Sequence, residues 1–196
     1  MHWIEGNHVV INSNQLIVAG YVLAVPTPRP PGPKGALLLE TFLTISDCLM
    51  SDLPKPEFWD WYVDRQEAER ARVARAAHAE TVTVAMTVAD AVDFMLLQGG
   101  ADQPYFELLR RRSRLPAEAT VIGYELVGAE TSLDFHSWHC HGYAAEAFDE
   151  LRVGLNEFGL IDTYEQATRA LTWMLGQPPE TSPPPVEWRV VGLARS

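Results

Sequence analysis

Cysteine and long apolar runs are both scarce in this chain of 196 residues. Cys48 and Cys140 are the two cysteines and lie far apart, which excludes a disulfide scaffold and indicates free thiols in a reducing compartment. The longest strongly apolar stretch, residues 16–25, is about half as long as a membrane-spanning helix. The first residues contain no basic segment followed by an apolar run, so no secretory signal is predicted. We therefore expect a cytoplasmic protein without a membrane partner.

Positive charge is also in short supply. Lysine and arginine together number 15 against 26 acidic residues, which gives a formal net charge of −11. Because phosphate binding requires a basic face, this balance argues against nucleic acid as the main partner. Hydrophobic residues make up 47% of the chain, enough to bury a core without a metal or a disulfide.

Common catalytic motifs are missing as well. The sequence contains no GxxxxGK[ST], GxGxxG, GxSxG or HExxH, which argues against the commoner nucleotide-binding and hydrolase classes. The 26 acidic residues have no distinctive spacing that would select a catalytic pair. We expect no cofactor.

Periodicity predicts a single α+β domain over residues 1–196, with an antiparallel or mixed sheet and helices packed on it. Five prolines in each of residues 26–33 and 178–185 predict stiff loops there. Strands are predicted at residues 9–12, 16–25, 36–45, 81–85, 120–128 and 186–194, with a hairpin turn at 12–15. Helices are predicted at residues 58–78, 87–98, 105–112, 143–151 and 163–175, with Thr87–Asp90 and Asp162–Glu165 as N-terminal boxes.

The segment FHSWHCH, residues 135–141, is the densest group of potential ligands and nucleophiles. A zinc site requires four converging ligands, and the chain offers no second pair to match His136 and Cys140, so no metal site is predicted. A thiol nucleophile is the second interpretation, in which Cys140 acts with His136 and Glu125 in a small thiol- or metal-dependent hydrolase.

A structural interpretation of the same segment carries more weight. In it, His136 and Ser137 bond backbone groups at a helix start, while Trp138 and Cys140 pack inside. The basic run RRRSR, residues 110–114, also has two interpretations. It could bind phosphate or an acidic partner, but such runs more often close a helix, where cations complement the dipole.

Two groups of residues are candidates for protein binding. Trp59, Asp60 and Trp61 alternate rings with an acid in FWDWY, a composition typical of interface anchors, although a core corner is the alternative. Glu146, Asp149 and Glu150 are predicted on the outer face of the 143–151 helix, opposite its apolar residues. Together with the acids of the 163–175 helix, they indicate a docking surface for a basic protein.

Residues 120–175 resemble a family of uncharacterised bacterial proteins of the immunity type. The pattern is GYE-[IL]-[VL]-G, then FHS-aromatic-x-C, then LNE-x-GL-[IF] and an acidic helix, with a weaker echo in PEFWDWY. The matching residues are Gly123, Tyr124, Glu125, Gly128, Phe135, His136, Ser137, Trp138, Cys140, Leu155, Asn156, Glu157, Gly159 and Leu160. His139 and His141 lie outside the pattern, and the resemblance assigns no catalytic residue.

The resemblance implies a non-enzymatic protein that binds and neutralises a cognate protein toxin of a polymorphic or contact-dependent system. The charge of the chain predicts that this toxin is basic. Two alternatives remain open at this point: the hydrolase centred on FHSWHCH, and an adaptor that uses PTPRPP as a polyproline docking segment. The sequence leaves the oligomeric state undetermined.

Overall fold

The structure is a computed structural model that describes residues 15–25, 27–28, 41–45, 53–56, 61–97, 103–129, 135–178 and 186–196. Its helices are α2 (Arg65–Arg75), α3 (Val88–Leu97), α4 (Glu107–Arg111), α5 (Tyr143–Leu151) and α6 (Tyr164–Leu175), with short 3-10 helices η1 (Pro104–Phe106) and η2 (Trp138–His141). Its strands are β1 (Leu16–Ala24), β2 (Thr27–Pro28), β3 (Thr41–Phe42), β4 (Glu80–Thr87), β5 (Thr120–Ala129), β6 (Phe135–Ser137) and β7 (Glu187–Arg195).

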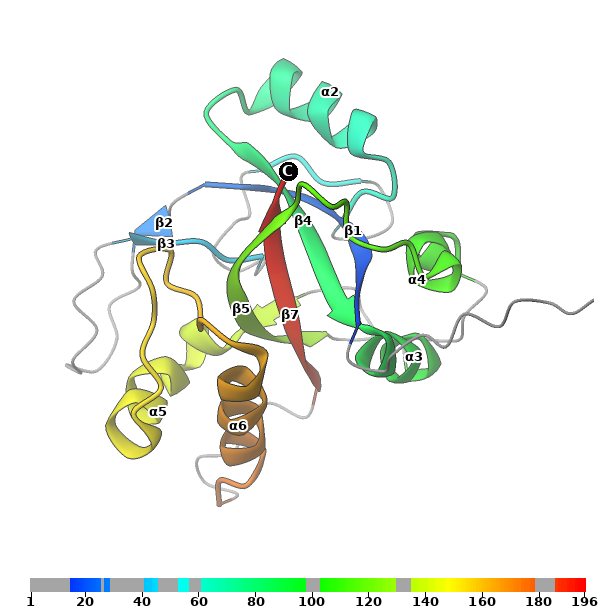
Figure 1. Ribbon diagram of the computed structural model, residues 1–196. Coiled ribbons are helices and arrows are strands. Elements are labelled where there is room, and N and C mark those ends of the chain that lie inside the picture. Colours follow the sequence, from blue (N-terminus) through cyan, green and yellow to red (C-terminus); the bar gives the residue numbers. More distant parts are fainter. Residues whose placement is uncertain are drawn as a thin grey trace, which may run out of the picture.

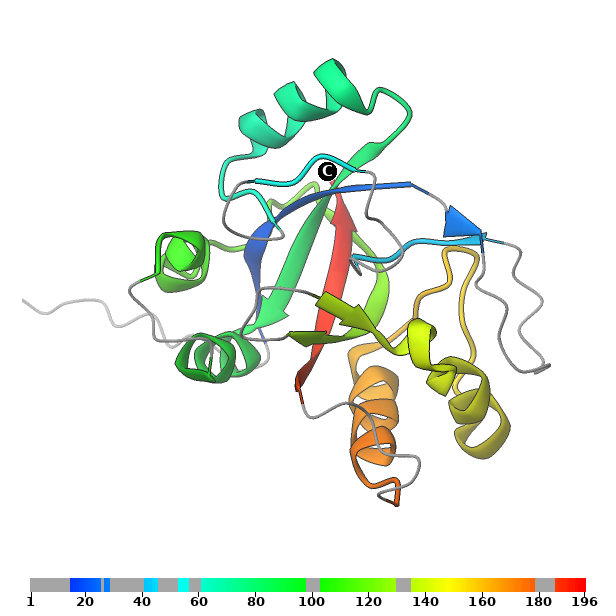
Figure 2. The ribbon, with the colours of Figure 1, turned by 180° about the vertical axis from the view of Figure 1, so that it is seen from behind.

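Five of the strands form one antiparallel sheet in the order β1-β4-β7-β5-β6 (Figure 1). The last strand in the sequence, β7, therefore lies at the centre, between β4 and β5. Helix α2 lies over one end of the sheet, while α5 and α6 lie at the other end (Figures 1 and 2). This architecture confirms the predicted α+β class. In the parts of the chain that the structure describes, no helix is long and apolar enough to cross a membrane.

The sheet has an apolar core on each face, because successive side chains of its central strands point to opposite faces. On β7, Val191 and Leu193 point into the larger core, whereas Trp188 and Val190 point into a second core beneath α5 and α6. A strand that is buried on both faces reads as a nearly continuous apolar run, and VEWRVVGLA is such a run.

Side-chain caps determine where several helices begin. Thr87 and Asp90 form the predicted capping box of α3: the Thr87 hydroxyl donates to Asp90 Oδ2 over 2.7 Å, and the Asp90 amide donates back over 3.1 Å. At α6 the prediction is wrong by one residue, because Thr163 and not Asp162 is the cap. The Gln166 amide donates to Thr163 Oγ1 over 3.2 Å.

Two predictions are wrong over part of their length. The helix predicted at 58–78 begins only at Arg65, because Tyr62 exchanges backbone hydrogen bonds with Tyr21 and Asp64 caps α2. Of the strand predicted at 36–45, residues 41–42 form β3, while the described residues 43–45 are not in a strand.

The other predicted elements differ from the structure mainly at boundaries. Helix α5 has the predicted bounds, and α6, β4, β5 and β7 lie within one or two residues of theirs. The three-residue strand β6 was missed because it is too short for periodicity to detect. The predicted strand at 9–12, the turn at 12–15 and most of the two proline-rich loops lie outside the described residues.

Candidate functional site

Three segments that carry the family resemblance meet around β5. The amide of Tyr124 donates to the Ile161 carbonyl over 2.8 Å, and the Ile161 amide donates to the Tyr124 carbonyl over 2.9 Å, so the LNEFGLI segment lies along the strand. Asn156 anchors this segment: its Nδ2 donates to the Ile122 carbonyl over 2.8 Å, and its Oδ1 accepts from the Phe158 and Leu160 amides. Asn156 is therefore a structural residue that fixes a turn.

Glu125 lies at the centre of this arrangement and has an exposed fraction of 0%. Its carboxylate accepts hydrogen bonds from the Thr44 hydroxyl over 2.5 Å, from the Ser137 hydroxyl over 2.5 Å and from the Ile45 amide over 3.1 Å. Burial raises the pKa of Glu125 to about 7, although the three donors oppose this shift. The carboxylate thereby ties residues 44–45 and β6 to β5, and it is sealed from solvent.

The hydrolase interpretation requires Glu125 and His136 in one site, and the structure places them on opposite faces of the sheet. Ser137 pairs with Val127 in the β5–β6 ladder, so its side chain lies on the same face of the sheet as that of Val127. From that face its hydroxyl donates to Glu125. Because neighbouring side chains in a strand alternate, His136 lies on the other face. Of Cys140, only the backbone is described, within η2. Among the described residues, no group of three His, Cys, Asp or Glu could hold a metal ion.

The structural interpretation of FHSWHCH is supported at two of its residues. Ser137 is the N-cap of η2, where its hydroxyl oxygen accepts from the His139 amide over 3.1 Å. Trp138 is 1% exposed and packs in the core beneath α5 and α6. His139 adds a contact with the third segment, because its Nε2 lies 3.1 Å from the Gly159 carbonyl oxygen.

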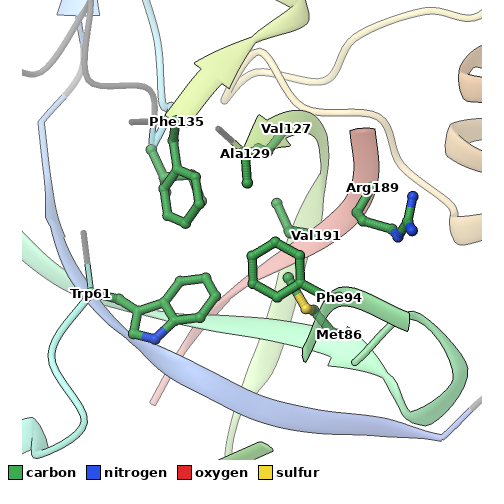
Figure 3. Close-up of a pocket in the computed structure, with 9 residues that line it drawn as sticks. Trp61, Met86, Phe94, Val127, Ala129, Phe135, Arg189 and Val191 are labelled. Atoms are coloured by element: carbon green, nitrogen blue, oxygen red, sulfur yellow. The ribbon is translucent and has the colours of Figure 1, made fainter. Parts of the chain in front are cut away.

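A small cavity lies inside the larger core, where the rings of Trp61, Phe94 and Phe135 point toward one another (Figure 3). Its volume is about 10 Å³, which is about the space of a single water molecule. Trp61 is 1% exposed, and its ring lies 5.3 Å from that of Phe135. A cavity of this size and lining is a packing defect and holds no substrate. Trp61 therefore lies in the core, in agreement with the alternative interpretation of FWDWY as a core corner. Trp59 and Asp60 lie outside the described residues.

The candidate site is therefore on the surface, on α5 and α6. The predicted residues Glu146, Asp149 and Glu150 are all exposed, while Ala144 and Ala147 of the same helix are buried. Three further acidic residues are exposed on α6 and in the α5–α6 connection. We call these six residues the acidic surface: Glu146, Asp149, Glu150, Glu157, Asp162 and Glu165. Two arginines, Arg152 and Arg169, are exposed in the same part of the chain, so the surface has an excess of negative charge.

Trp173 adds an aromatic side chain to this surface, and the sequence interpretation missed it. The residue is half-buried, its Nε1 donates to Glu150 Oε2 over 2.7 Å, and its ring packs edge-on against Tyr143 at 6.4 Å between centroids. These contacts link α5 to α6 and hold one carboxylate in place. The signal in the sequence was a tryptophan beside the apolar stripe of α6, where a half-exposed ring is expected.

The RRRSR run closes a helix, as its structural interpretation predicts. Helix α4 ends at Arg111, and Arg112 follows in the left-handed conformation with a φ of 50°. Arg111 forms an ion pair with Glu107, and Arg110 Nη1 donates to the Gln103 carbonyl over 3.0 Å.

Comparisons of the chain with protein-family models, with curated proteins and with solved structures found no match. The immunity-type family remains a prediction, and the geometry of the acidic surface is the main support for a function.

Proposed function

We propose that this is a non-enzymatic, cytoplasmic protein of the immunity type, which binds a cognate protein toxin and neutralises it. The acidic surface on α5 and α6 is the binding face, and the toxin presents a basic surface to it. The single observation that carries the proposal is the exposure of Glu146, Asp149 and Glu150 together on α5, beside the half-buried ring of Trp173.

Two physical properties of this face support a binding role. Negative charge on one face steers a basic partner and raises the association rate. The face is also anchored to the rest of the fold, because α5 and α6 share a core with the sheet and the bond from Trp173 to Glu150 joins the two helices. A preformed face loses little conformational entropy on binding, and tryptophan is among the residues that contribute most at interfaces.

The proposal is tested by co-expression with the product of the gene directly upstream. We expect this chain to restore growth to cells that express that product, to co-purify with it, and to inhibit its activity in a purified assay. A neighbour without toxic activity contradicts the proposal, as does a stable complex in which the toxin keeps full activity. A matched test of the hydrolase alternative is Cys140→Ala, which is expected to protect as well as the wild type.

A further inference from the structure

A groove of about 380 Å³ opens within the acidic surface, between the start of β1, the middle of β5 and the first turn of α6. The residues that line it are Leu16, Tyr124, Asp162, Thr163, Tyr164 and Glu165. This volume is near the lower end of the range for small-ligand sites, so the groove has room for one long side chain and is too small for a folded segment.

Two aromatic rings form one part of the groove wall, and their positions are fixed. Tyr124 and Tyr164 pack edge-on with centroids 5.9 Å apart, and both are half-buried. The Tyr164 hydroxyl donates to Asp90 Oδ2 over 2.7 Å, which attaches the ring to the first turn of α3. A half-buried tyrosine offers a ring face to a cation at low entropic cost.

Carboxylates form the polar rim of the same groove. Asp162 and Glu165 line it and are exposed, so both can reach a ligand. Glu165 acts on the ring beside it: burial raises the pKa of Tyr124, and the negative charge of Glu165 raises it further. The two carboxylates outweigh the partial positive charge at the start of α6, which is about half an elementary charge.

We propose that the groove receives an arginine side chain of the partner protein. A guanidinium group is planar and stacks on an aromatic ring, and its fork of N–H donors matches a carboxylate. The lining of the groove includes both kinds of group, the rings of Tyr124 and Tyr164 and the carboxylates of Asp162 and Glu165. The inference rests on the proposed function for the identity of the partner, and it makes the groove the specific anchor within a broader attraction between charged surfaces.

The experiment uses an isolated arginine side chain, so that it does not depend on any toxin. The purified full chain, labelled with ¹⁵N, is titrated with N-acetyl-arginine N-methylamide and followed by NMR. We expect saturable shifts at the amides of Tyr124, Tyr164 and Glu165. The matching citrulline compound has the same shape without the charge and is expected to produce no saturable shift.

Variants locate the binding. Asp162→Asn with Glu165→Gln is expected to weaken arginine binding at least tenfold. Glu146→Gln with Asp149→Asn removes the same charge outside the groove and is expected to change arginine binding less than twofold.

Equal shifts from arginine and citrulline overturn the inference, as do equal losses in the two double variants or shifts that map elsewhere. A groove that binds arginine in a protein that protects against no toxin would refute the proposed function alone. Toxin neutralisation without arginine binding would refute the groove alone.

Discussion

At the scale of single residues, the side chain of Glu125 joins three segments of the fold. A carboxylate with three hydrogen-bond donors and no exposure is a junction between β5, β6 and residues 44–45. Because its burial raises the pKa from the ordinary value of 4.5 to about 7 in the folded protein, we expect the free energy of unfolding to depend on pH.

The sign follows from proton uptake. Between pH 4.5 and pH 7 the folded state binds a proton at Glu125 that the unfolded state releases, so the free energy of unfolding falls as pH rises through this window. At about 1.4 kcal/mol per pKa unit, the loss is about 3 kcal/mol. The variant Glu125→Gln lacks this titration. Measured by urea unfolding, its free energy of unfolding is therefore expected to fall between pH 4 and pH 8 by about 3 kcal/mol less than that of the wild type. The exposed control Glu118→Gln should follow the wild type, and an unchanged slope in Glu125→Gln would show the account of its burial to be wrong.

Gly123 is a second residue whose identity the fold requires. Its φ is +148°, and a β-carbon there would lie 2.5 Å from the β-carbon of Leu160. Gly123→Ala is expected to lower the free energy of unfolding by at least about 2 kcal/mol through overpacking and backbone strain. Gly154→Ala is the matched control, because a β-carbon at that position would have no atom within 4 Å and the expected change is below about 0.5 kcal/mol. Equal effects on chemical denaturation would contradict the packing of LNEFGLI against β5.

At the scale of elements, the start of α6 has two candidate N-caps, Asp162 from the sequence and Thr163 from the structure. Thr163→Ala removes the hydroxyl that accepts from the Gln166 amide, and is expected to lower the free energy of unfolding by about 1 kcal/mol. Asp162→Ala leaves the cap in place and is expected to cost less. Thermal or urea unfolding of both variants gives the comparison, and the reverse order would restore Asp162 as the cap.

The elements that sequence patterns predicted well are those with a long, clear period. Helix α5 alternates buried alanines with exposed acids, so both its bounds and its outer face were predicted. Strand β6 was not, because its position depends on Ser137 reaching Glu125, a contact between residues that are 12 apart in the chain. The groove was missed for the same reason: Leu16, Tyr124 and Tyr164 come from three elements that only the sheet order brings together.

At the scale of the whole molecule, charge is unevenly distributed. The acidic surface lies on α5, α6 and the segment between them, whereas the exposed arginines of the RRRSR run lie at α4, on the other side of the sheet (Figure 1). Association with a basic toxin should therefore depend on ionic strength. We expect the association rate, measured by stopped flow, to fall at least tenfold between about 0.05 M and 0.5 M salt, because the Debye length shortens over this range. A rate that is independent of salt would exclude steering by this surface.

The central claim is that the acidic surface binds the toxin, and charge reversal tests it most directly. The measurement is the dissociation constant for the upstream gene product with Glu146→Lys/Asp149→Lys, compared with Asp93→Lys/Glu118→Lys. Both variants change the net charge equally at exposed positions, but the second lies on α3 and before β5. The account predicts at least a tenfold loss of affinity for the first variant and less than a twofold loss for the second. Equal losses in the two variants, or no loss in either, would contradict it.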